Sequence, residues 1–273
     1  MKPLSPLAAM TFAAALGLCA AMPAAAQSST PDSGWEFELT PYFWMTALKG
    51  ETQINNLPQA NINMSFSDVW NMLDFGLMGT FEARKGRWGL FFDGFYAKMS
   101  DSGGRSTTLS PGPGQGVGVS ANASLTLKNT IIEAAVEYRV IEGSTPVDLF
   151  FGARYNEIDI DATVDVSALG PLGFAPSRST TFNYSKNWVD PYIGVRVMHP
   201  VAAHWTLVGY YDFGGFGVGS DFTWQALAGV KYEINKTFSA SAGYRFLHID
   251  YNNGGFLYDM DYKGAYLALG IKF

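Results

Sequence analysis

Apolar and polar side chains alternate along most of this chain with a period of two residues. In "GAYLALGIKF" (264–273), one face takes alanine, leucine, isoleucine and phenylalanine, and the other is mostly glycine, tyrosine and lysine. The same division recurs in "FTWQALAGVKYE" (222–233) and "WEFELTPYFWM" (35–45). Because successive side chains of a β-strand point to opposite faces, the alternation predicts strands that each have one apolar face.

The pattern predicts ten strands joined alternately by short and long connections. The strands are expected at 35–48, 74–85, 88–100, 120–140, 147–166, 182–198, 204–213, 220–233, 238–251 and 259–273. The short connections are expected near 85–87, 142–146, 200–203 and 235–236, and the long ones at 49–73, 101–119, 167–181, 214–219 and 252–258. One short stretch, 67–73, has a helical period, and Ser67 is its expected cap.

Short turns at one end and long loops at the other, with an even number of strands, are typical of an outer-membrane barrel. The predicted fold class is therefore all-β: a single transmembrane up-and-down antiparallel β-barrel of about ten strands, occupying 35–273. Eight or twelve strands are the alternatives, because 49–66 could form an additional hairpin.

The N-terminus has the features of an export signal. Lys2 precedes an apolar run that ends at Met22, and "PAAAQ" follows, which places the expected cleavage between Ala26 and Gln27. Residues 1–26 are therefore predicted to be a signal peptide, and 27–34 a short segment before the barrel. An N-terminal membrane anchor is the alternative. The single cysteine, Cys19, lies inside the signal, so no disulfide is expected.

The composition narrows the classes of function. Aromatic and charged residues each make up 15% of the chain, and the formal net charge is -6. An acidic balance argues against nucleic acid as a partner, because nucleic-acid binders need a basic surface. No cofactor is predicted. After the signal, no apolar stretch is long enough for a transmembrane helix, which leaves strands as the membrane-spanning elements.

The chain resembles small bacterial outer-membrane β-barrel proteins of the opacity-type and porin-like group. The resemblance rests on the export signal, the alternating strands and the C-terminal strand. That strand carries the expected insertion signal Leu267, Leu269, Ile271 and Phe273. Such families commonly end in an aromatic residue, and an aromatic residue is often also found at the position of Ile271. The resemblance implies a location in the outer membrane of a Gram-negative bacterium, with both termini periplasmic. The implied partners are outer-membrane lipid, lipopolysaccharide and the barrel-insertion machinery.

Charges of both signs are expected inside the barrel. If Phe273 faces lipid and the apolar face of each strand points outward, the charged side chains point into the lumen, where they avoid a cost of roughly 2–4 kcal/mol at mid-membrane. Placing Val140 opposite Val147 would also set Arg139 against Asp148 and Glu133 against Arg154. The predicted ladder of lumen charges is Asp93, Glu133, Glu137, Arg139, Asp148, Arg154, Arg196, Lys231 and Arg245.

Several functions are compatible with this pattern. The predicted protein is porin-like, and its ladder would serve either a structural envelope protein or a narrow passive channel for small polar solutes. A second hypothesis is an adhesin-type surface-interaction barrel that uses the loops 49–73, 101–119 and 167–181. A third is a hydrolase with His248, Asp250 and Ser220 at its rim, but no oxyanion hole can be identified and we expect no enzyme. Tryptophans near strand ends, Trp188 among them, are expected in interfacial girdles.

The stretch "NEIDIDATVDV" (156–166) alternates acids with isoleucines and at first resembles a calcium loop. Such a loop needs glycine at its sixth position and glutamate at its twelfth, where this chain has Ala162 and Ala168. Keeping the phase of the lower strand turns the acids outward and the isoleucines inward. This reversal of polarity predicts that the strand leaves the membrane near Asn156. A bulge that flips the phase is the competing interpretation.

Overall fold

The computed structural model describes residues 34–109, 117–169 and 177–273. The predicted signal peptide, its cleavage site and most of 27–34 lie outside the described residues. The strands are β1 (Glu36–Trp44), β2 (Ala47–Ile54), β3 (Ala60–Met64), β4 (Leu73–Lys85), β5 (Trp88–Leu109), β6 (Val117–Ile141), β7 (Val147–Leu169), β8 (Ser177–Ala202), β9 (Trp205–Gly214), β10 (Phe222–Glu233), β11 (Phe238–Asn253) and β12 (Phe256–Lys272).

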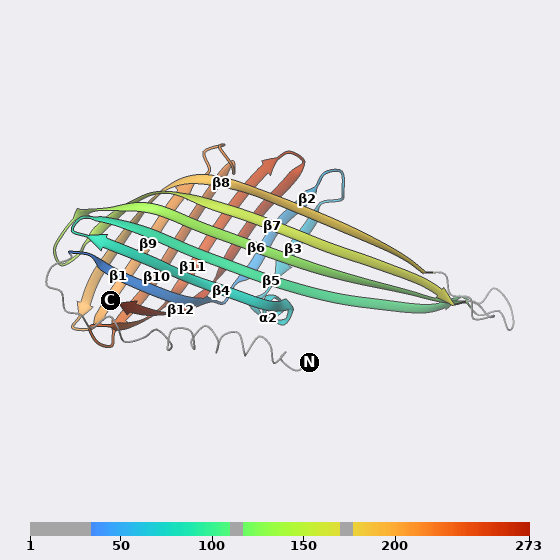
Figure 1. Cartoon of the computed structure of the whole chain (residues 1–273), viewed down its shortest axis with the longest axis horizontal. Helices are drawn as coiled ribbons and strands as arrows, with labels where there is room; N and C mark the ends of the chain where they lie inside the picture. The colour runs from blue at the N-terminus through green and yellow to red at the C-terminus, as the bar shows by residue number, and fades with distance from the viewer. Residues whose placement is uncertain (1–33, 110–116, 170–176) are drawn as a thin grey trace.

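Ten of these strands close into an antiparallel ring, which confirms the predicted fold class. The ring runs from β1 through β4 to β12 in sequence order, and β12 pairs with β1 to close it (Figure 1). The closing contact joins the two ends of the barrel sequence, because Phe37 and Phe273 exchange backbone hydrogen bonds of 3.2 and 3.0 Å. Closure leaves no unpaired edge around the ring at this level.

The segment expected as one strand at 35–48 is split into β1 and β2. Both halves pair with β12, and β3 adds to β2, so the additional hairpin brings the sheet to twelve strands. Pairing of β1 with β4 ends where Pro41 meets Gly79. Proline has no N–H for a ladder hydrogen bond, which suits the end of a pairing.

The short helix α2 (Phe66–Met72) lies beyond this point, between β3 and β4. Its cap is Ser65, not the expected Ser67: the Ser65 hydroxyl accepts from the Asp68 N–H while the Asp68 carboxylate accepts from the Ser65 N–H. This reciprocal pair satisfies two donors at the start of the helix. Within the described residues no helix is long and apolar enough to cross a membrane.

The strands β5 to β8 continue far beyond their neighbours, and Figure 1 shows them as a long curved extension at one end. They contain 22, 25, 23 and 26 residues, whereas a strand needs about 9–11 to cross a bilayer. The expectation of loops at 101–119 and 167–181 was therefore wrong for their described parts. These stretches are polar on the outside and rich in small residues, so they lack the strong alternation that marked the other strands.

The short turns all lie at the end of the barrel that holds the last residue, here named the terminal end. They are 86–87, 142–146, 203–204 and 234–237, close to the expected positions. At the opposite end, 252–258 is not the expected long connection. It contains a hairpin turn with Gly254 and Gly255 at positive φ, a conformation that glycine adopts without strain.

Candidate functional site

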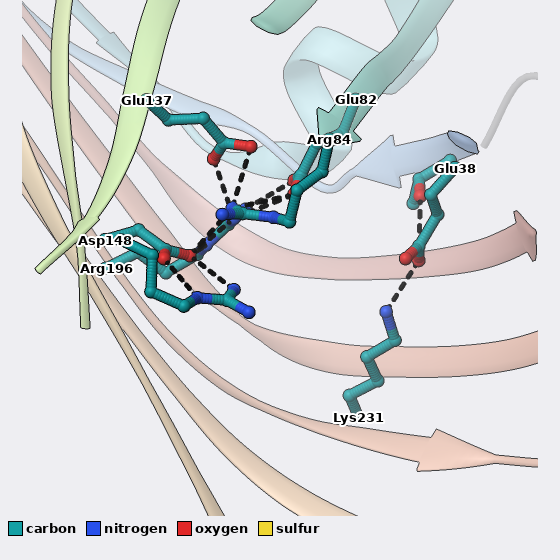
Figure 2. Close-up of polar contacts among 9 residues, drawn as sticks. Glu38, Glu82, Arg84, Glu137, Asp148, Arg196 and Lys231 are labelled. Carbon is teal, nitrogen blue, oxygen red and sulfur yellow. Dashed lines mark hydrogen bonds and ion pairs between the residues drawn. The ribbon is translucent and has the colours of Figure 1, made fainter. Parts of the chain in front are cut away.

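The interior of the barrel is the candidate site, and charged side chains fill its terminal half. Nearest the terminal end, three arginines and three acids form one network: Glu82, Arg84, Glu137, Arg139, Asp148 and Arg196. Figure 2 labels five of the six, which converge from β4, β6, β7 and β8. Arg196 alone contacts three carboxylates, at 2.6 Å from Glu82 and 2.9 Å from both Glu137 and Asp148. The charges of this terminal network balance.

A second network lies deeper in the lumen and is built around Arg154. The guanidinium is fully buried, with Nε 2.9 Å from Glu133 and an amino group 2.9 Å from Asp212. Arg245 joins it through Asp93 at 3.3 Å and Glu133 at 3.5 Å. This central network has one acid more than it has bases. Neutral donors compensate: Tyr42 donates to Asp93, and the Gln225 amide donates to Asp212.

An aromatic layer separates the two networks. Phe150 makes edge-to-face contacts with Phe91 and Tyr210, each at 5.4 Å between ring centroids. The Arg196 guanidinium lies over the Phe150 ring at 5.0 Å, and that of Arg154 lies over Tyr192 at 5.2 Å. Planar guanidinium groups stack well on aromatic faces, so this layer packs against charges on both sides.

Aromatic and aliphatic side chains pack together in the opposite half of the lumen. Trp44 packs on Phe95 and Tyr262, and Trp188 stacks on Tyr251 with 4.2 Å between centroids. The apolar plug consists of buried side chains including Trp44, Leu48, Phe95, Met99, Ile131, Ile158, Trp188, Leu247, Ile249, Tyr251, Phe256, Tyr258, Met260 and Tyr262. Beside α2 it leaves a cavity of about 30 Å³. A cavity of that size holds little more than a water molecule.

The structure places all nine residues of the predicted ladder on the inner face of the barrel. Eight belong to the two networks, while Lys231 forms a separate pair with Glu38 at 2.6 Å (Figure 2). The register sets Arg139 opposite Asp148 and Glu133 opposite Arg154. The expected pairing of Val140 with Val147 was wrong. Val147 pairs with Ile141, and a bulge lies between Arg139 and Ile141.

The ladder prediction left out Glu82, Arg84 and Asp212, which complete the two networks. Alternation alone already put these three on the inner face. What it could not give is the contact between strands that are distant around the ring. Arg196 on β8, for example, meets Glu82 on β4, and no local pattern connects these strands.

Trp188 was wrongly expected in an interfacial girdle. Its ring is buried in the lumen, and its indole N–H donates to Asp190 and to Ser220. The Asp190 carboxylate is fully buried and also accepts from the Ser220 N–H and from the Asn156 amide. This cluster ties the connection after β9 to the side of β8.

The residues considered for catalysis do not come together through any described hydrogen bond. The Ser220 hydroxyl donates to Asp190 at 2.8 Å, whereas the His248 ring lies 2.9 Å from Asp261. Asp250 pairs across the sheet with Asp259.

The acidic row of 156–166 keeps its phase. The β6–β7 register continues without a shift from Gly118 to Arg139, which rules out the bulge that would have flipped the faces. Ile158 is buried in the plug, while Asp161 lies outside, 3.6 Å from Lys128. Within the described ranges, no group of three or more metal-ligating side chains could hold a metal ion.

Comparison with known proteins supports the class of the fold. No family model and no curated protein matches the sequence. Among solved structures, the outer-membrane protease OmpT from Escherichia coli aligns over 89% of this chain and 98% of its own, with a TM-score of 0.57 and 12% identity. Neisserial surface protein A aligns over 88% and 98%, with a TM-score of 0.30 and 14% identity. The chain therefore has the fold of the outer-membrane β-barrel proteins, and at this identity the likeness extends to the fold alone.

Proposed function

We propose that the protein is a structural envelope protein of the Gram-negative outer membrane, with a closed, salt-bridged lumen and both termini on the periplasmic side. The observation that carries this proposal is the filled interior. Arg154, Glu137 and Asp148 are fully buried in the lumen of a barrel that the apolar plug closes at its other end. Ten strands lie near the eight-stranded barrels that side chains fill, and far from the sixteen-stranded barrels that hold a channel.

The same interior disfavours a narrow passive channel for small polar solutes. A solute would have to separate Arg196 from three carboxylates and then displace the Phe150 layer. Separating a buried ion pair leaves uncompensated charges, which costs several kcal/mol. The apolar plug adds a second barrier, because it offers few polar groups to replace the hydration shell of a solute.

Single-channel recording from the refolded protein in planar bilayers tests the proposal. The wild type is expected to give no conductance at any holding potential. A variant that loses closing side chains at every level, E137A/R196A, F150A, R154A/D212A and W44A/Y262A, is the control that shows that inserted barrels would be detected. Heat-dependent gel mobility verifies that each protein is folded. Steady conductance from the folded wild type would overturn the closed lumen and favour the channel.

A second candidate function is surface interaction, and the β5–β8 extension favours it. Nothing in the barrel wall requires strands of 22 to 26 residues. The extension starts opposite the terminal end of the barrel, so in the proposed orientation it would stand outside the cell. We therefore propose that the interacting surface is this extended sheet, in place of the loops expected from the sequence.

The partners and the absence of catalysis are further parts of the proposal. The exposed apolar side chains around the ring, such as Phe151, Ile193 and Leu267, would contact lipid. Lipopolysaccharide would meet the outward polar row above them, and the insertion machinery would read the strand that ends at Phe273. We propose no enzymatic activity, in keeping with the separate partners of Ser220 and His248.

A further inference from the structure

Among the described residues, no strand neighbours the outer edge of β8 over residues 177–187. β7 pairs with β8 from Ser177 to Val197, but β9 pairs with it only from Tyr192 onward. The connection after β9 extends this cover to Asp190 and Trp188, where Ser220 is bound. Beyond Trp188, no backbone hydrogen bond from another part of the described chain reaches this edge.

The direction of the backbone groups along this edge can be assigned. Gly215 donates to the Pro191 carbonyl from the β9 side, while Met198 donates to Pro146 on the β7 side. Because the two backbone groups of a strand residue point the same way, odd-numbered residues of β8 direct theirs to the outer edge. The free edge therefore presents the N–H and C=O groups of Ser177, Ser179, Thr181, Asn183, Ser185 and Asn187.

The side chains of the edge divide cleanly between the two faces of the sheet. The odd-numbered residues place only serine, threonine and asparagine on the outer face. The inner face carries aromatic rings between two cations: Phe182 and Tyr184 lie between Arg178 and Lys186. Phe182 stacks parallel to Tyr184, and Lys186 reaches over the Tyr251 ring at 5.5 Å. Phe182 is 39% exposed, so the inner face of the edge is open to a ligand at this ring, while Tyr184 packs against Phe256 of the apolar plug.

This edge lacks two of the devices that keep sheet edges from pairing, a proline and a bulge, and its two cations disfavour only a strand of like charge. Below it, the outward side chains of β8 are apolar at Val189, Ile193 and Val197, and they become polar from Asn187 onward. The edge thus lies above the lipid-facing band. Residues 177–187 contain no proline, and the register of β8 with β7 shows no bulge. An edge of this kind is a template for an added strand whose charges do not repel its cations.

We propose that the free edge of β8 binds an extended polypeptide segment of a partner protein as an added antiparallel strand. The two cations specify its chemistry. A strand set directly opposite 177–187 would carry acids eight residues apart, facing Lys186 and Arg178. Between the acids, apolar side chains would face Tyr184 and Phe182. The inference deepens the surface-interaction role and is independent of whether the lumen conducts.

A second copy of this chain fits the edge less well when the two edges overlap completely. Two copies paired antiparallel about Phe182 would set Arg178 of each against Lys186 of the other. Like charges directly opposite each other destabilise a pair of strands. An acidic segment replaces both repulsions with attractions.

The test uses the refolded full chain in detergent micelles and a synthetic peptide of eleven residues. The peptide is threonine throughout, except for glutamate at positions 2 and 10 and valine at positions 4 and 6. The control peptide has lysine at positions 2 and 10. We expect the glutamate peptide to bind and to slow hydrogen exchange at the Thr181, Asn183 and Ser185 amides. The even-numbered amides between them, already bonded to β7, should not change.

Two pairs of variants separate edge pairing from simple charge attraction. Asn183→Pro removes one edge N–H without touching the β7 ladder, and Asn183→Ala keeps it. The proline variant should bind the glutamate peptide about fivefold more weakly than the alanine variant, because it lacks one hydrogen bond to the peptide. The double variant R178E/K186E should prefer the lysine peptide. If the proline variant does not fold, the charge-reversed variant and the hydrogen-exchange pattern still show whether the peptide binds as an added strand.

Equal binding of the two peptides by the wild type, or exchange that slows at neither set of amides, would overturn the proposal. Protection of the odd-numbered amides that appears without peptide and rises with protein concentration would assign the edge to a second copy, and would overturn it as well. Heat-dependent gel mobility, measured in parallel, distinguishes loss of binding from loss of the barrel.

Discussion

Arg154 on β7 lies directly opposite Glu133 on β6, with 2.9 Å between Nε and Oε1 and both side chains shielded from solvent. The same guanidinium also binds Asp212 on β9. One side chain thus joins strands from separate parts of the ring, and its removal would leave two buried carboxylates without their main counter-charge.

Arg154→Met is therefore expected to destabilise the barrel by about 3–5 kcal/mol, the cost of breaking a buried ion pair. Urea unfolding in lipid vesicles, with gel mobility as the readout, measures this loss of stability. The matched control is Arg87→Met, whose partner Glu142 is exposed at a turn. Exposed pairs contribute about 0–1 kcal/mol. Equal losses in the two variants would mean that the central network does not hold the barrel together.

The apolar plug should contribute to stability in the same assay. Leu247 is fully buried in it, whereas Leu57 is 50% exposed between β2 and β3. Leu247→Ala is expected to cost about 2–5 kcal/mol, because it removes contacts and leaves a cavity. Leu57→Ala should stay within about 0.5 kcal/mol. A Leu247→Ala variant as stable as the wild type would show that the plug is loosely packed.

Gly264 marks a close approach of two chain segments at the break between β1 and β2. A Cβ atom there would lie 1.9 Å from the Met45 carbonyl oxygen, whereas at Gly209 nothing lies within 4 Å. Gly264→Ala should therefore destabilise by about 1–3 kcal/mol, the usual cost of overpacking. Gly209→Ala is the control and should change the unfolding midpoint little. A larger loss of stability in Gly209→Ala than in Gly264→Ala would contradict this packing.

The height of the membrane along β7 can be mapped by arginine substitution. Phe151 points outward within the apolar band, and Asp165 points outward in the extension. Phe151→Arg should cost about 2–4 kcal/mol in vesicles, because it buries a charge in lipid, and Asp165→Arg should cost almost nothing. A comparable cost at both positions would refute the interpretation of the acidic row as a mark of membrane height.

Most of the fold could be predicted from the sequence. A period of two assigns each side chain to a face, and a face that is apolar along a whole strand needs an apolar environment. The positions of the short turns followed from the ends of this alternation. It failed at 35–48, where the chain breaks into β1 and β2 with no change in polarity. It failed again in β5–β8, whose distal parts carry small polar residues and so lack the alternation of the other strands.

Sequence alone determined that acids and bases share the lumen, because period and polarity act within a single strand. Only the tertiary structure decided which of them meet. Arg196 and Glu82 are 114 residues apart and reach each other across the barrel interior, a distance set by the closure of the ring. The same holds for Trp188, whose strand position suited a girdle but whose ring points inward to Asp190 and Tyr251. The free edge of β8 is likewise a tertiary property, because it exists only where β9 ends before its neighbour does.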